Sequence, residues 1–119
     1  MAVKELLIGG KDGLQVVMDA AMGNRHGVIS GATGTGKTIT LQILAESYSH
    51  LGVPVFLADI KGDLSGIARE GKAHAKITER IENIQISDFN FQANPTVFWD
   101  IFASQGHPVR ATISDLGPL

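Results

Sequence analysis

The chain has 119 residues, a formal net charge of −2 at pH 7 and no cysteine. This length suits one small domain, and the lack of cysteine excludes disulfides and thiolate metal sites and is typical of a cytosolic protein. No apolar run approaches the ~18 residues of a transmembrane helix, and the charge excludes a strongly basic nucleic-acid footprint. We therefore expect a cytoplasmic globular protein with no membrane partner.

The first 25 residues are predicted to form a small β-hairpin and a lead-in to the core. Two apolar runs, ELLIGG (5–10) and LQVVM (14–18), flank Lys11-Asp12-Gly13. Asp-Gly between two apolar runs is a strong signal for a tight hairpin turn. We assign residues 1–25 to this unit and residues 26–119 to the nucleotide-binding core.

A phosphate-binding motif follows. GATGTGKT (31–38) fits the pattern G-x-x-x-x-G-K-[ST], called Walker A. The short apolar run HGVIS (26–30) before it predicts a buried strand. Residues 38–51 after it carry apolar side chains at helical spacing, and Gly52 supplies a stop. Strand, loop and helix in this order are the context that the motif requires.

Each part of this loop has a predicted role toward ATP and Mg²⁺. Gly31, Gly34 and Gly36 permit positive φ and let backbone N–H groups approach an anion. The helix that follows directs its free N–H groups toward the same phosphates. Lys37 would lie at the β- and γ-phosphates, and Thr38 would place its hydroxyl on Mg²⁺. The predicted nucleotide-binding residues are Gly31, Ala32, Thr33, Gly34, Thr35, Gly36, Lys37 and Thr38.

Later segments predict a partial α/β core. The apolar run VPVFLAD (53–59) is typical of a parallel strand covered on both faces, and residues 73–84 predict a helix with one buried stripe. Residues 84–102 alternate around Asn94-Pro95 and predict two strands with a turn between them. The aromatic residues expected in the core of that segment are Phe89, Phe91, Phe98, Trp99 and Phe102.

The predicted fold class is therefore α/β: a partial P-loop NTPase (RecA-like) core, with parallel strands and flanking helices, preceded by the hairpin. Such a core needs about five parallel strands with crossover helices, and two or three are predicted here. We expect the chain to be the amino-terminal piece of a longer protein, with exposed apolar surface near Ile29 and Phe56 and no enzymatic ATP hydrolysis by itself.

Asp59 ends an apolar run, as the acid of a Walker B strand does, and three interpretations stay open at first. In the first, Asp59 binds Mg²⁺ directly, as in some small-molecule kinases. In the second, it begins the D-x-x-G of a GTPase. In the third, it ends the ordinary strand after the first helix and caps the next turn, and the true Walker B strand lies beyond the end of the chain. The GTPase interpretation fails because neither N-K-x-D nor T-K-x-D occurs. The kinase interpretation needs a lid with arginines, and Arg69, Arg80 and Arg110 are scattered. The candidate catalytic residues are Lys37 and Asp59.

Two polar residues precede the first core strand. Arg25 and His26 would contact the nucleotide or a neighbouring subunit, or would form a polar entry loop.

Three segments together resemble the HerA-like branch of the HerA/FtsK superfamily of P-loop ATPases: residues 24–47, 53–68 and 94–119. The resemblance implies a longer protein, a later Walker B strand that ends in Asp-Glu, an arginine finger from a neighbouring subunit and a hexameric ring. Only Gly31 to Thr38 match the nucleotide site of the family. ADIKGD (58–63) matches a family segment to which the residues assign no role.

We predict that the chain binds ATP and that the full-length protein hydrolyses it as a hexameric HerA-like motor acting on DNA. The hexamer and the DNA follow from the resemblance alone. Two alternatives remain: a small-molecule kinase, which a screen of phosphate acceptors would identify, and a non-hydrolytic module in which ATP drives assembly, which turnover would exclude.

Overall fold

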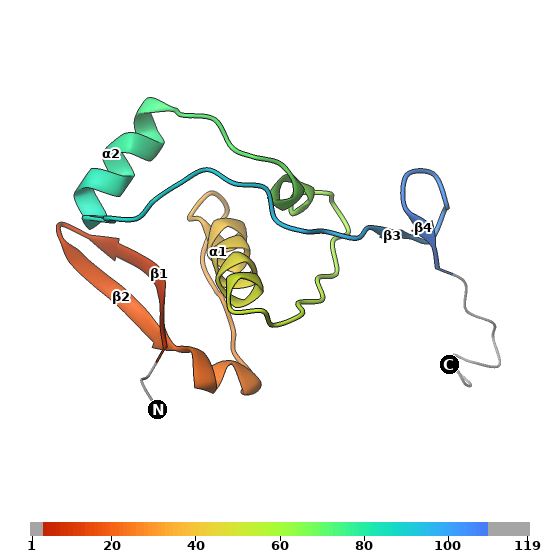
Figure 1. The fold of residues 1–119 in the computed structure, drawn as a ribbon, viewed down its shortest axis with the longest axis horizontal. Helices are drawn as coiled ribbons and strands as arrows, with labels where there is room; N and C mark the ends of the chain where they lie inside the picture. The colour runs from red at the N-terminus through yellow and green to blue at the C-terminus, as the bar shows by residue number, and fades with distance from the viewer. Residues whose placement is uncertain (1–3, 110–119) are drawn as a thin grey trace.

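A computed structural model describes residues 4–109 of the chain, and Figure 1 shows its fold. Strands β1 (Glu5–Lys11) and β2 (Leu14–Asp19) pair antiparallel. Asp12 and Gly13 join them with φ of 51° and 77°, and two successive positive φ angles define the type I′ turn that Asp-Gly favours. The predicted hairpin is confirmed. A register shift between Leu7 and Gly9 marks a β-bulge in β1.

Two α-helices and two short 3₁₀ helices follow. They are η1 (Ala20–Asn24), α1 (Lys37–His50), η2 (Ser65–Ala68) and α2 (Ala75–Ile84). Helix α2 begins where the His74 ring accepts a hydrogen bond from the Lys76 N–H, and it ends at Gln85, whose φ is 60°. Both predicted α-helices are confirmed, because local spacing and end signals determine where helices form.

The hairpin packs against both α-helices. At its tip, the Asp12 N–H donates to Asn83 Oδ1 (3.1 Å), and Asn83 Nδ2 donates back to the Asp12 carboxylate (2.8 Å). At its other end, the Tyr48 hydroxyl of α1 donates to the Ala20 carbonyl at 3.0 Å. Leu6 of β1 and Ile84 of α2 are buried. These contacts hold the lead-in to the glycine-rich loop beside α1.

The strands predicted over residues 26–30 and 53–59 are not formed. Both segments run toward the N-terminal end of α1 (Figure 1), yet neither has a ladder partner among residues 4–109. An apolar run becomes a strand only where a neighbouring strand supplies its hydrogen bonds. Val28 is 91% exposed and Phe56 is 87% exposed, so apolar surface lies open around both segments, as we expected near Ile29 and Phe56.

Of the two strands predicted within residues 84–102, only the two-residue strand β3 (Trp99–Asp100) is formed, and its partner lies outside that range. Residues 85–98 form an irregular segment, which we call the strap, and it crosses α1 (Figure 1). The Gln92 side chain contacts His50, and Asn94 bonds to Glu46, so the strap is attached to α1. The local alternation within residues 85–98 therefore does not pair these residues into a sheet.

A small parallel sheet follows the strap. Strand β3 (Trp99–Asp100) pairs with β4 (His107–Pro108). Parallel pairs usually need a connection of about a dozen residues or more, whereas residues 101–106 suffice here. The Asp100 carboxylate folds this connection back, because it accepts hydrogen bonds from the N–H groups of Phe102, Ser104 and Gln105 and from the Ser104 hydroxyl. These bonds lower the pKa of Asp100, with the Ser104 hydroxyl contributing most.

Most of the aromatic residues expected in the core lie at the surface instead, and Phe91 is half-buried. Trp99 is 64% exposed and Phe102 is 87% exposed, while Phe89 and Phe91 pack edge to face with ring centroids 5.0 Å apart. The core prediction is wrong because no second layer covers this face in the part of the chain that the structure describes. Arg110 lies outside the described residues.

Few of residues 4–109 are buried. The buried apolar residues are Leu6, Ala45, Leu64 and Ile84, and the buried polar residue is Asn94. The radius of gyration is 16.9 Å, against about 13–14 Å for a compact chain of this length. The fold is a mixed α/β arrangement with an antiparallel hairpin and a small parallel sheet. The division into residues 1–25 and 26–119 stays a prediction.

Candidate phosphate-binding site

The glycine-rich loop connects the 26–30 segment to α1. Gly34 has φ of 82°, and Gly36, the N-cap of α1, has φ of 95° and ψ of 16°. Both values lie in the left-handed region, where a residue with a Cβ atom is strained. Around both positions no atom lies within 4 Å of where a Cβ would stand. Backbone conformation alone therefore requires glycine at these two positions.

The Ala32 carbonyl oxygen is the main acceptor within this loop. It accepts from the Thr35 hydroxyl at 2.7 Å, from Lys37 Nζ at 2.8 Å and, at the longer distance of 3.4 Å, from the Thr35 N–H. The last of these closes a β-turn over residues 32–35 with Gly34 at its third position, where type II turns require positive φ. The side chain of Lys37 is thus folded over its own loop.

The first turn of α1 has its backbone donors available. Gly36 has no side chain to cap the helix, and the first intrahelical bond runs from the Thr40 N–H to the Gly36 carbonyl at 2.9 Å. Within the described residues, no hydrogen bond is formed by the side chain of Thr38, which is exposed. Free N–H groups and the positive end of the helix dipole favour an anion at this position. The residues present fit a phosphate group.

Gly31 is closely packed against the same loop. A Cβ atom at Gly31 would lie 2.6 Å from Thr35 Oγ1 and 3.7 Å from the Lys37 side chain. The space that a side chain would occupy is taken by the two side chains that share the Ala32 carbonyl. The motif includes Thr35 among the loop residues, but it assigns the Thr35 side chain no role, because it accepts any residue at that position.

Asp59 caps the turn that follows the 53–59 segment. Its Oδ1 accepts from the N–H groups of Lys61 (3.2 Å) and Gly62 (2.8 Å), and its Oδ2 accepts from that of Leu64 (2.9 Å). These bonds lower the pKa of Asp59, the Leu64 N–H contributing most. The geometry is that of the turn-capping interpretation. A role of Asp59 toward a metal stays a prediction.

Helix α1 brings this turn close to the glycine-rich loop. Gln42 Nε2 donates to the Asp63 carbonyl at 3.1 Å. Gln42 follows Thr38 by four residues, so the two lie on the same face of α1. The turn capped by Asp59 therefore lies beside the helix face that carries Thr38. Sequence reasoning missed Gln42, since an isolated glutamine on a helix gives no pattern.

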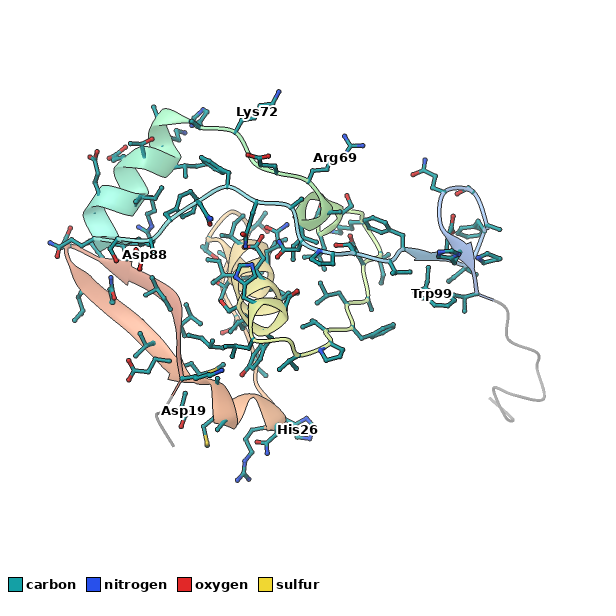
Figure 2. The ribbon with its side chains drawn as sticks, in the orientation of Figure 1. Asp19, His26, Arg69, Lys72, Asp88 and Trp99 are labelled. Atoms are coloured by element: carbon teal, nitrogen blue, oxygen red, sulfur yellow. The ribbon has the colours of Figure 1, made fainter. Side chains whose placement is uncertain are left out.

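The other candidates lie apart from the loop. Arg25 and His26 are exposed, and Figure 2 places His26 beside η1, at the opposite end of the 26–30 segment from the loop. Among residues 4–109 no group of three or more His, Cys, Asp or Glu residues is arranged to hold a metal ion. The helices described for residues 4–109 are all too short or too polar to span a membrane.

The site is therefore a glycine-rich loop that leads into the N-terminus of a helix within a mixed α/β chain, a geometry suited to an anion. The family model "Helicase HerA-like C-terminal" matches residues 4–119. The chain belongs to this family, and the resemblance to the HerA-like branch is confirmed. No curated protein and no solved structure shows significant similarity to the chain.

Proposed function

We propose that residues 31–38 bind ATP together with Mg²⁺, and that the full-length protein hydrolyses ATP to drive a HerA-like motor. The observation that carries the proposal is the conformation of the loop. Gly34 and Gly36 adopt left-handed φ, the N-terminus of α1 has no side-chain cap, and Lys37 Nζ lies on the Ala32 carbonyl of the same loop. Membership of a family of helicases supports the same function.

Each part of the loop would make a different contact with ATP and Mg²⁺. Lys37 would exchange the Ala32 carbonyl for the β- and γ-phosphates, since an ammonium binds a phosphate oxygen more strongly than a neutral carbonyl. The N–H groups at the start of α1 would bind phosphate oxygens. The Thr38 hydroxyl would hold Mg²⁺, and bound Mg²⁺ would neutralise charge on the triphosphate. Ala32 and Thr33 would contribute backbone contacts.

The RecA-like core is part of this proposal. The segments 26–30 and 53–59 run in the same direction beside α1 (Figure 1), and apolar side chains of both are exposed. Parallel strands of an α/β sheet are buried on both faces. We infer that the two segments become strands of a parallel sheet in the full-length protein. A hexameric ring and DNA as a partner rest on the family alone.

Calorimetric titration of the full-length protein with ATP and Mg²⁺ tests the loop. Lys37→Ala should weaken binding by about a hundredfold or more, because it removes a charge-assisted contact to phosphate. Lys72→Ala is the matched control: Lys72 is exposed on the stretch between η2 and α2 (Figure 2), and its loss should leave the affinity unchanged. Equal affinities for the Lys37→Ala variant and the wild type would refute the proposal.

A second experiment separates the two interpretations of Asp59. If Asp59 serves the metal, Asp59→Asn should lower turnover with little loss of stability. If Asp59 only caps the turn, turnover should persist and the melting temperature should fall slightly. Both quantities are measured on the same variant, and transfer of phosphate to a small molecule instead of water would favour the kinase alternative.

A further inference from the structure

Thr35 shares one acceptor with the lysine of the phosphate-loop motif. The Thr35 hydroxyl lies 2.7 Å from the Ala32 carbonyl oxygen, and Lys37 Nζ lies 2.8 Å from the same oxygen. The Thr35 N–H is 3.4 Å away, near the outer limit of a hydrogen bond. Two strong donors and one weak donor therefore satisfy this carbonyl.

The position of the Thr35 hydroxyl is closely defined. The β-turn over residues 32–35 places Thr35 opposite Ala32, and Gly34 permits this turn with φ of 82°. Gly31 leaves room on the other side, because a Cβ there would lie 2.6 Å from Thr35 Oγ1. The loop is thus built around the bond between Thr35 and Ala32.

We propose that Thr35 is a positioning residue for Lys37, an inference that rests on the proposed nucleotide binding by this loop. When Lys37 moves to a phosphate, the Ala32 carbonyl loses one of its two strong donors. The Thr35 hydroxyl still donates to that carbonyl and keeps the turn closed, so little free energy is lost when Lys37 moves to the phosphate. Without the hydroxyl, only the long bond from the Thr35 N–H would remain.

The Thr35 hydroxyl thus donates to the same carbonyl as Lys37, whereas the Thr40 hydroxyl donates only to a carbonyl at the start of α1. Thr40 Oγ1 donates to the Gly36 carbonyl at 3.2 Å, and the Thr40 N–H already donates to the same oxygen at 2.9 Å. Removal of the Thr40 hydroxyl leaves its acceptor with a good backbone donor. Thr40→Val is therefore a matched control for Thr35→Val, since both lose one hydroxyl and keep the side-chain shape.

The experiment measures the Kd for ATP with Mg²⁺ and the steady-state kcat on the full-length protein. Thr35→Val should raise the Kd roughly fivefold, the size of one hydrogen bond, with kcat at saturating ATP within about twofold of wild type. Thr35→Ser, which keeps the hydroxyl, and Thr40→Val should each retain the wild-type Kd within about twofold. Thermal melting identifies any variant that does not fold, and Thr35→Ala then replaces Thr35→Val.

The outcomes separate this inference from the proposed function. If Lys37→Ala loses binding while Thr35→Val and Thr35→Ala bind as the wild type does, the role of Thr35 is refuted and nucleotide binding stands. If Thr35→Ser weakens binding as much as Thr35→Val, the shape of the side chain matters rather than its hydroxyl, and the inference is again refuted. If Lys37→Ala binds normally, the proposed function fails and the inference fails with it.

Discussion

Replacing Asn94 with alanine removes a buried amide that joins the strap to α1 and to η2. Asn94 is only 6% exposed. Its Nδ2 donates to Glu46 Oε1 at 3.0 Å and to the Ile67 carbonyl at 3.2 Å. Its backbone N–H also donates to the Ile67 carbonyl, at 3.1 Å, and alanine would keep that bond. The substitution therefore isolates the side-chain contribution.

The expected loss of stability in Asn94→Ala is the difference between two opposing contributions to the free energy of unfolding. Two side-chain hydrogen bonds, one of them to a carboxylate, contribute together about 2–4 kcal/mol to the free energy of unfolding. Against this, Asn94 Oδ1 is buried without a partner among the described residues, and removing such a group returns about 1–3 kcal/mol. We therefore expect Asn94→Ala to destabilise the protein by about 1–2 kcal/mol.

Urea unfolding monitored by circular dichroism measures this loss. Asn90→Ala, an exposed asparagine of the same strap, is the matched control and should change stability by less than ~0.5 kcal/mol. Asn94→Asp should destabilise more than Asn94→Ala near neutral pH, because it sets a carboxylate against that of Glu46. A loss no larger than that of Asn90→Ala would refute the view that this amide joins the three elements.

Four further predictions concern other parts of the chain. Gly36→Ala should lower the free energy of unfolding by about 1–2 kcal/mol, because φ at Gly36 is 95°. Gly27 is the control: like Gly36 it has open space where a Cβ would stand, and Gly27→Ala should leave stability unchanged. Equal urea midpoints for the two variants would contradict this prediction. The pKa of Asp59 is lowered in the folded state, so the Asp59 carboxylate stabilises the fold above its unfolded pKa of about 3.9, and this contribution is lost as pH falls through the folded pKa. The difference in melting temperature between wild type and Asp59→Asn should therefore shrink below about pH 4. A difference that stays constant with pH would contradict the turn-capping role of Asp59. Alanine substitutions of Asp12 and Asn83 in a double-mutant cycle should show a coupling of about 0.5–1 kcal/mol, and no coupling would mean that the hairpin tip is not held by this pair. Residues 1–119 alone should release phosphate from ATP more slowly than about one per second, because cleavage also requires a positioned water and an arginine finger; faster release would overturn this expectation.

The elements predicted correctly from sequence are those that local interactions determine. The hairpin turn is specified by Asp12 and Gly13, which adopt the positive φ angles that the turn type requires. Helix α1 begins directly after Gly36 of the motif and ends shortly before Gly52, whereas α2 carries its apolar side chains on one face between its caps, His74 and Gln85. In each case the interacting residues lie within a few positions of one another.

The strands predicted wrongly depend on partners that are distant in sequence. Residues 26–30 and 53–59 have the composition of buried parallel strands, but composition does not provide the neighbour that completes a ladder. The pairing of Trp99 with His107 depends instead on the Asp100 carboxylate, which folds the connection between them. An acid that nucleates such a turn looks the same in sequence as any other exposed acid.

The site shows the same division between local and distant information. The motif identified residues 31–38 because its spacing is a local pattern, and the left-handed φ of Gly34 and Gly36 agrees with it. The sharing of the Ala32 carbonyl by Thr35 and Lys37 appears only in three dimensions. So does the attachment of Asn94 to Glu46, for which the Asn-Pro pair indicated only a turn.

The hydrogen bonds of Asp59 limit how this residue could also take part in binding a metal. A carboxylate offers about four acceptor positions, and the N–H groups of Lys61, Gly62 and Leu64 occupy three of them. The remaining position can accept from a water that binds Mg²⁺, while direct ligation would have to displace a turn bond. Gln42 keeps this turn beside the face of α1 that carries Thr38. A metal role for Asp59 that acts through a water would depend on an intact turn. Asp59→Asn therefore has a third outcome besides the two named under Proposed function: a loss of both turnover and stability would indicate that Asp59 has both roles.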